Sequence, residues 1–104
     1  MYKVPKTLKS INVLGKDVKI KFSNAKLDAN QAYGMYDREF IYLRTQYDTY
    51  ETFICTLVHE SFHAHCHIVG LQLDLQVEEV LAVTSERLFE SMRKVLSTQI
   101  HTQD

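Results

Sequence analysis

In the first half of the chain, hydrophobic and polar residues alternate in short runs separated by turn residues, as they do in β-strands with one buried face. Residues 9–22 contain one pair of such runs, with apolar side chains at Ile11, Val13, Val18, Ile20 and Phe22. Residues 32–44 contain a second pair, on either side of Asp37 and Arg38, and this pair is rich in aromatic and β-branched residues. We therefore expect two β-hairpins, with a polar loop or short turn at residues 23–31 between them.

The period changes to that of an α-helix over residues 48–70. Apolar residues there fall on one broad arc of a helical wheel, and polar residues occupy the other side. Asp48 followed three residues later by Glu51 is a capping-box pattern, and Gly70 is suited to end the helix. We expect a largely buried helix with one polar strip.

A second helical period follows Asp74, which we expect to cap a C-terminal helix that reaches about Ser97. One apolar stripe, which we expect to be buried, runs along it at Val77, Leu81, Thr84, Leu88 and Val95, widened by Val80 and Met92. Residues 1–8 and 98–104 are expected to be peripheral. The pattern as a whole predicts an α+β domain spanning residues 1–104, with a small antiparallel sheet followed by two helices.

Composition narrows the range of partners. The chain has 104 residues, enough for one core, and a formal net charge of -1, which gives no reason to expect nucleic acid or an anionic membrane as a partner. The N-terminus has no apolar leader and no run approaches membrane-spanning length. Cys55 and Cys66 lie about 16 Å apart on one helix, too far to form a disulfide. We expect a cytoplasmic protein with free thiols.

Candidate chemistry lies on the polar strip of residues 48–70, which contains the motif His59-Glu60-Ser61-Phe62-His63. On a helix, two histidines four residues apart project from one face and can bind one metal ion. A glutamate beside the first is placed to act as a general base. The motif predicts one Zn²⁺ per chain, held by His59 and His63, with Glu60 as the catalytic residue.

A catalytic zinc site normally has a third protein ligand, and the C-terminal helix offers Glu78 and Glu79. Glu78 lies one turn before Leu81, close to the apolar stripe, so we favour Glu78 and keep Glu79 as the alternative. Two rival metal pairs, Cys55 with His59 and His63 with His67, have the same spacing but no carboxylate in the base position.

Together these residues resemble a known family. His59-Glu60-Ser61-Phe62-His63, after short strands and before a glycine and a helix with Glu78-x-x-Leu81-x-x-Thr84-Ser85, is similar to the small gluzincin-type, zincin-like metallopeptidases of the ImmA/IrrE type, most of all their compact phage and prophage versions. The resemblance implies His59 and His63 as zinc ligands, Glu60 as general base and the Glu78 position as third ligand. For a phage-encoded protein it also implies the host cytoplasm.

The expected activity is hydrolysis of a peptide bond in a protein or peptide substrate by metal-activated water. We nominate the strand at residues 40–44 for pairing with an extended peptide, and Tyr33, Tyr36 and Tyr42 as candidates for stabilising the oxyanion. Two alternatives stay open: a zinc-binding regulatory or interaction module without peptidase activity, and a metal-free interaction protein. The oligomeric state is not predicted.

Overall fold

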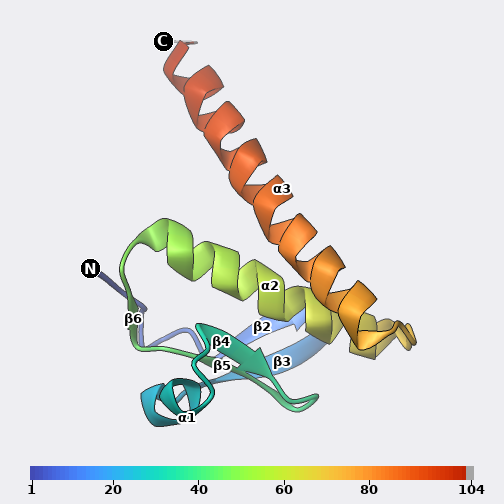
Figure 1. Cartoon of the computed structure of the whole chain (residues 1–104). Helices are drawn as coiled ribbons and strands as arrows, with labels where there is room; N and C mark the ends of the chain where they lie inside the picture. The colour runs from blue at the N-terminus through green and yellow to red at the C-terminus, as the bar shows by residue number, and fades with distance from the viewer. Residues whose placement is uncertain (103–104) are drawn as a thin grey trace.

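A computed structural model of the chain describes the backbone of residues 1–102 and the side chains of residues 1–95. Six short strands and one short helix precede two long helices (Figure 1). In chain order, the elements are β1 (Tyr2–Lys3), β2 (Ser10–Val13), β3 (Lys16–Phe22), α1 (Asn24–Ala29), β4 (Gly34–Tyr36), β5 (Phe40–Leu43), β6 (Gln46–Tyr47), α2 (Tyr50–Val69) and α3 (Leu75–Thr102).

The main sheet has four strands in the order β2-β3-β5-β4. Both expected hairpins are confirmed, since β2 pairs with β3 and β4 pairs with β5 in antiparallel fashion. The central pair, β3 with β5, is parallel, with Ile20 opposite Ile41. The α+β class is therefore correct, but the sheet is mixed rather than wholly antiparallel, because the chain between β3 and β4 crosses over before the second hairpin begins.

That crossover contains α1, where we expected a loop. Ser23 caps the helix by accepting a hydrogen bond from the Lys26 backbone N–H, and Leu27 is completely buried. A helix of six residues with one buried side chain is too short to produce a visible hydrophobic period. The expectation of a loop is wrong for this reason.

The core lies between one face of the sheet and α2. It contains Ile41 and Leu43 from β5 and Phe53 and Ala64 from α2. The N-terminus contributes as well, because Val4 is 6% exposed and β1 pairs with β6 in a separate two-stranded ladder. The expectation that residues 1–8 are peripheral is thus wrong for the first few of them.

Helix α2 carries the histidine motif where the sequence places it. Its N-cap is Thr49 rather than Asp48, since the Thr49 side chain accepts a hydrogen bond from the Thr52 backbone N–H. Gly70 ends the helix in the left-handed conformation at φ 75°, as predicted. The motif therefore lies on a regular α-helix.

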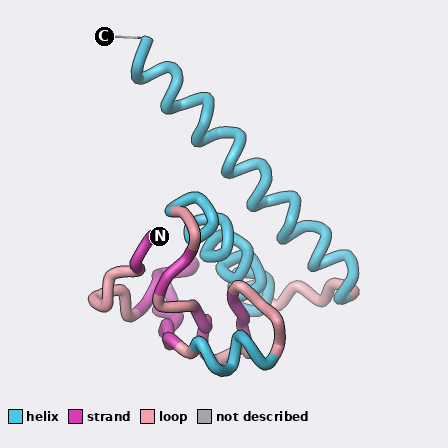
Figure 2. The backbone as a smooth tube through the Cα atoms, turned by 60° about the vertical axis from the view of Figure 1, so that its left-hand side comes forward, coloured by secondary structure: helices cyan, strands magenta, loops and turns pink. Residues whose placement is uncertain are grey.

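Helix α3 crosses α2 and then projects away from the rest of the chain (Figures 1 and 2). It continues to Thr102 rather than ending near Ser97, and residues 103–104 of the expected frayed tail lie outside the described residues. The expected burial of its apolar stripe is wrong: Val77, Leu81, Leu88 and Val95 are 40–59% exposed. Among residues 1–102, no helix is long and apolar enough to cross a membrane.

Candidate metal centre

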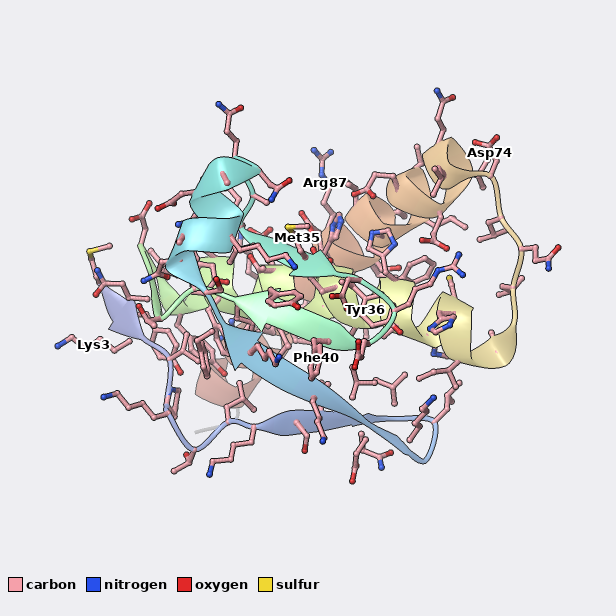
Figure 3. All side chains as sticks on the ribbon, turned by 90° about the horizontal axis from the view of Figure 1, so that it is seen from below. Lys3, Met35, Tyr36, Phe40, Asp74 and Arg87 are labelled. Carbon is pink, nitrogen blue, oxygen red and sulfur yellow. The ribbon has the colours of Figure 1, made fainter. Side chains whose placement is uncertain are left out.

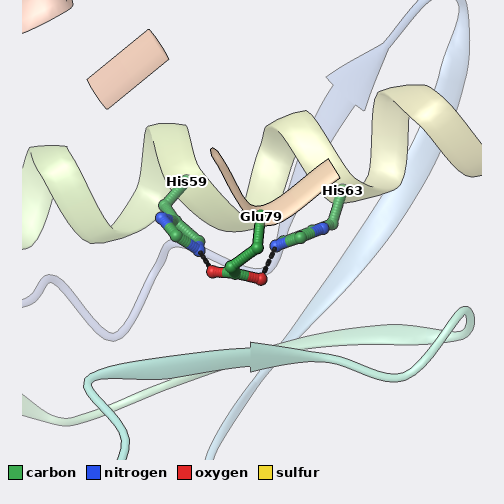
Figure 4. A group of neighbouring side chains, drawn as sticks. All are labelled: His59, His63 and Glu79. Carbon is green, nitrogen blue, oxygen red and sulfur yellow. Dashed lines mark ion pairs between the residues drawn. The ribbon is translucent and has the colours of Figure 1, made fainter. Parts of the chain in front are cut away.

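The two motif histidines face one carboxylate of α3. In the cluster drawn in Figure 4, His59 Nε2 lies 2.6 Å from Glu79 Oε1, and His63 Nε2 lies 3.1 Å from Glu79 Oε2. The two imidazole rings are 5.1 Å apart between centroids. Glu79 therefore spans the gap between them, with one carboxylate oxygen on each ring.

The other nitrogen of each ring meets a different glutamate of α3. His59 Nδ1 lies 2.9 Å from Glu86 Oε2, and His63 Nδ1 lies 2.5 Å from Glu78 Oε2. In metal sites, the ring nitrogen away from the metal usually donates to a carboxylate, which fixes the ring orientation and tautomer. Both histidines have this arrangement if their Nε2 atoms are the ligands.

The donor set fits a small divalent cation. One ligand atom from each of His59, His63 and Glu79 can be chosen so that all lie within 4.8 Å of one another. Ligands of a tetrahedral zinc lie roughly 3.3 Å apart, so small side-chain movements suffice to bring them around an ion. The His59 and His63 side chains are 16% and 15% exposed, whereas that of Glu79 is 56% exposed. The group thus opens to solvent on the Glu79 side.

The structure brings together every predicted site residue but gives the two glutamates different positions. Glu79 lies between the Nε2 atoms, and Glu78 lies on the outer nitrogen of His63. Our preference for Glu78 depended on placing the apolar stripe of α3 against α2. Because α3 instead turns its carboxylates toward α2, the geometry favours Glu79 as the third ligand, and the choice between them stays a prediction.

Glu60 lies beside this group and is 7% exposed. It lines a cleft of about 450 Å³, whose walls are formed by Tyr33, Gly34, Glu51, Thr52, Cys55, Thr56, His59, Glu60, Glu86 and Glu90. Burial raises the pKa of the Glu60 carboxyl, although the neighbouring His59 and His63 act in the opposite direction. A carboxyl with a raised pKa at the wall of a cleft is suited to accept a proton near neutral pH.

The electrostatics of His59 are dominated by the same carboxylates. Burial alone lowers the pKa of this imidazole, but Glu60, Glu86 and Glu79 together raise it above its usual value. The cluster of four glutamates around two histidines is therefore a strongly negative environment, which attracts a cation.

Gly34 sets the distance between β4 and α2. A Cβ atom at this position would lie 2.6 Å from Thr56 Cγ2 and 3.1 Å from Glu60 Cγ. Only glycine lets the strand approach the helix this closely beside Glu60. Sequence reasoning missed this residue, and a glycine inside a strand pattern is the signal that could have found it.

The strand beside the cleft is β4, not the one we nominated. Residues 40–43 form β5, which is hydrogen-bonded on both sides by β3 and β4 and has no free edge for a peptide. The sheet edge nearest the site is β4, and Figure 3 shows Met35 and Tyr36 on it near the two helices. The nomination of residues 40–44 is therefore wrong, because the parallel pairing with β3 places that strand inside the sheet.

The three candidate tyrosines have different partners. Tyr42 donates to Asp37 Oδ2 at 3.1 Å, away from the histidines. The Tyr36 hydroxyl is 2.7 Å from His67 Nδ1. His67 belongs to the rival metal pair His63 with His67, so this contact engages one nitrogen of that pair. Tyr33 lines the cleft and is 65% exposed, so its hydroxyl is the one best placed to reach a bound molecule.

The two cysteines are free, as expected. Cys66 is 1% exposed, and burial together with the charge of Glu78 raises the pKa of its thiol. Burial and three nearby glutamates likewise raise the pKa of Cys55. Neither thiol has the lowered pKa of a reactive cysteine.

Comparisons of the chain with protein-family models, with curated proteins and with solved structures find no match.

Proposed function

We propose that this protein is a zinc-dependent metallopeptidase that hydrolyses a peptide bond in a protein or peptide substrate. The observation that carries the proposal is the convergence of His59 Nε2, His63 Nε2 and the Glu79 carboxylate, with a carboxylate behind each imidazole. Two imidazoles and a carboxylate form a donor set that zinc prefers. The alternative choice of Glu78 as third ligand is less favoured because that carboxylate meets only the outer nitrogen of His63.

A zinc ion bound there would lower the pKa of a bound water and polarise the substrate carbonyl. Glu86 and Glu78 hold the rings of His59 and His63 in place by accepting hydrogen bonds from Nδ1. Glu60 accepts the proton of the attacking water and passes it to the leaving amine. Burial raises the pKa of Glu60 and so moves it toward neutral pH, where a general base works best.

The substrate would lie in the cleft as an extended segment along the edge strand β4. Backbone hydrogen bonds of an exposed strand bind a peptide without regard to its sequence. Tyr33, at the mouth of the cleft, is our candidate for donating a hydrogen bond to the developing oxyanion. The order of strands, motif helix and glutamate-bearing helix supports the resemblance to compact metallopeptidases of the ImmA/IrrE type, which stays part of the proposal.

Metal content and hydrolysis test the proposal together. After dialysis against trace zinc, elemental analysis of the wild type should find one zinc per chain, and Glu79→Ala should lose it while Glu90→Ala, on the same helix, keeps it. Glu60→Gln should retain zinc and lose hydrolysis of a denatured protein such as casein by at least ~1000-fold, the effect of removing a general base with its metal site intact. Zinc-free wild type, or Glu60→Gln with full activity, would overturn the proposal.

A second candidate is a zinc-binding regulatory or interaction module without peptidase activity. It is favoured by the way α3 is attached, because Glu79, which would hold zinc together with His59 and His63, also joins α3 to α2 through these two histidines. In this case zinc stabilises the fold, as in structural sites. His63→Ala would then lower the thermal midpoint in the presence of zinc, while Glu60→Gln would change neither stability nor the binding of a partner.

A further inference from the structure

Helix α3 carries a continuous apolar face that no described residue covers. The exposed fractions are 48% for Val77, 63% for Val80, 59% for Leu88, 55% for Met92 and 55% for Val95. The face is completed by Leu81 at 40% and by Thr84, which is also exposed. Contiguous apolar surface of this kind on a folded domain marks an interaction site.

The face cannot turn inward to be buried within the same chain. The opposite side of α3, with Glu78, Ala82 and Glu86, packs against α2, and Ala82 there is completely buried. The side of α2 that meets α3 is itself polar and carries the motif histidines. A rotation of α3 that buried its apolar face would move the glutamates away from the histidines.

We propose that a second copy of this chain covers the face, with the α3 helices of two copies packed side by side. The helix has the period of a two-stranded coiled coil: Leu81, Leu88 and Val95 are each seven residues apart, and the second heptad position is occupied by Val77, Thr84 and Ser91, of which Val77 is apolar and the other two are small and polar. We call the line of these residues from Val77 to Val95 the seam. In a second helix of the same sequence, the same side chains recur at the same spacing, so each can insert between side chains of the partner along the seam. This inference does not depend on the proposed peptidase activity.

The length of the face agrees with a dimer. A standard stable interface buries about 800 Å² on each partner, and the exposed apolar side chains of α3 extend from Val77 to Val95. Helix α3 has 28 residues and is therefore about 42 Å long. It is long enough for the whole seam from Val77 to Val95 to be paired.

The arrangement of the chain leaves room for the partner. Val77, Leu88 and Val95 are exposed, whereas Ala82 on the side of α3 that packs against α2 is completely buried, so in the proposed dimer α2 would not lie between the two α3 helices. The C-terminal part of α3 also stands clear of the sheet in both views of the backbone (Figures 1 and 2). In the dimer, each helix would use one side for its partner and the other side for the glutamates at the metal centre.

Sedimentation equilibrium of the full chain over about 5–200 µM, with one equivalent of zinc, tests this inference. The wild type should sediment at twice the chain mass, and the double variant Leu81→Glu/Leu88→Glu should be monomeric, with a dissociation constant at least ~100-fold higher. A Leu14→Glu variant is the matched control, because Leu14 is as exposed as Leu88, at 59%, but lies in the β2–β3 turn. It should dimerise like the wild type.

The substituted leucines are exposed, so the double variant should keep its fold, which far-UV circular dichroism would check. A wild type that is monomeric across the whole range would overturn the proposal and assign the face to a different protein. A dimer that survives the double substitution would overturn it as well, because the interface would then lie elsewhere. His63→Ala, tested in parallel, should remain dimeric, which separates this proposal from the one about zinc.

Discussion

Helix α2 is held on its two sides by different kinds of interaction. Toward the sheet it presents Phe53 and Ala64, which are 4% and 0% exposed and pack with Ile41 and Leu43. Toward α3 it presents His59 and His63, whose nitrogens meet carboxylates. The first interface consists of buried apolar surface and the second mainly of hydrogen-bonded charge.

Because of this difference, the packing of the sheet on α2 and the docking of α3 on α2 should respond to different conditions. Burial of apolar side chains does not depend on metal or on any single charge. The contact with α3 places three glutamates next to two histidines, and a bound cation would relieve the repulsion among the carboxylates. We therefore expect the sheet with α2 to be the constant part of the molecule, and the docking of α3 to depend on what occupies the metal centre.

The largest expected effect is on the apolar side. Phe53→Ala removes a ring that is 4% exposed and stacks on Tyr2 at 5.2 Å. It should lower the free energy of unfolding by about 3–5 kcal/mol, as large-to-small core substitutions do. Urea unfolding followed by circular dichroism measures this, and a loss below 1 kcal/mol would show that the sheet–α2 interface is not the main source of stability.

Removal of metal should act mainly on α3. In hydrogen–deuterium exchange, backbone amides at residues 78–93 should exchange roughly 100-fold faster after chelation than with zinc at 100 times its dissociation constant. Amides of β3, β5 and the sheet side of α2 should change by less than a factor of a few. If amide exchange became faster by the same factor in both regions, the docking of α3 would not depend on metal more than the packing of the sheet against α2 does.

A smaller effect is expected from the glutamates behind the histidines. Glu86→Gln weakens the hydrogen bond on His59 Nδ1. The zinc affinity of this variant should fall about 10–100-fold, as it does when the hydrogen-bond partner of a metal-binding histidine is replaced in other proteins. Glu90→Gln is the matched control, since Glu90 pairs with Lys94 in the next turn rather than with a histidine. Competition with a chromogenic chelator measures both affinities, and equal losses would mean that general negative charge, not ring orientation, is responsible.

The smallest effect should appear at Cys66, a reporter of α3 docking. The pKa of both thiols is raised, but Cys66 is only 1% exposed, so it should be at least ~10-fold slower than Cys55 toward a disulfide reagent at pH 7.5. Cys55 is only partly buried and provides the internal comparison. Chelation should speed up Cys66 severalfold, and an unchanged rate would argue that α3 stays docked without metal.

The sheet and α2 were also easier to predict from the sequence than α3. Alternation of apolar residues located both hairpins, and Gly70 located the end of α2, because these signals are local. The short helix α1 was missed because one buried leucine makes no period. The parallel pairing of β3 with β5 was missed because it depends on where the crossover returns the chain, which no local pattern specifies.

The expected burial of the apolar stripe of α3 was wrong for a different physical reason. An amphipathic helix is normally expected to bury its apolar stripe, and α3 does the opposite over residues 77–95. The motif itself identified His59, Glu60 and His63 because their spacing is a property of one helix. The roles of Glu78, Glu79 and Glu86 depend on the rotation of one helix against another, and Gly34 depends on the approach of a strand, so both needed the tertiary structure.

The ladder between β1 and β6 bears on the order in which the chain folds. It pairs Tyr2 with Tyr47, so both hairpins lie within the segment of chain that this ladder closes. Closing so long a loop costs entropy that the local hairpins avoid. We expect the N-terminal strand to dock after the transition state, with a φ-value near zero for Val4→Ala. A value near one would mean that the two ends of this segment meet first and that the hairpins form inside a loop already closed.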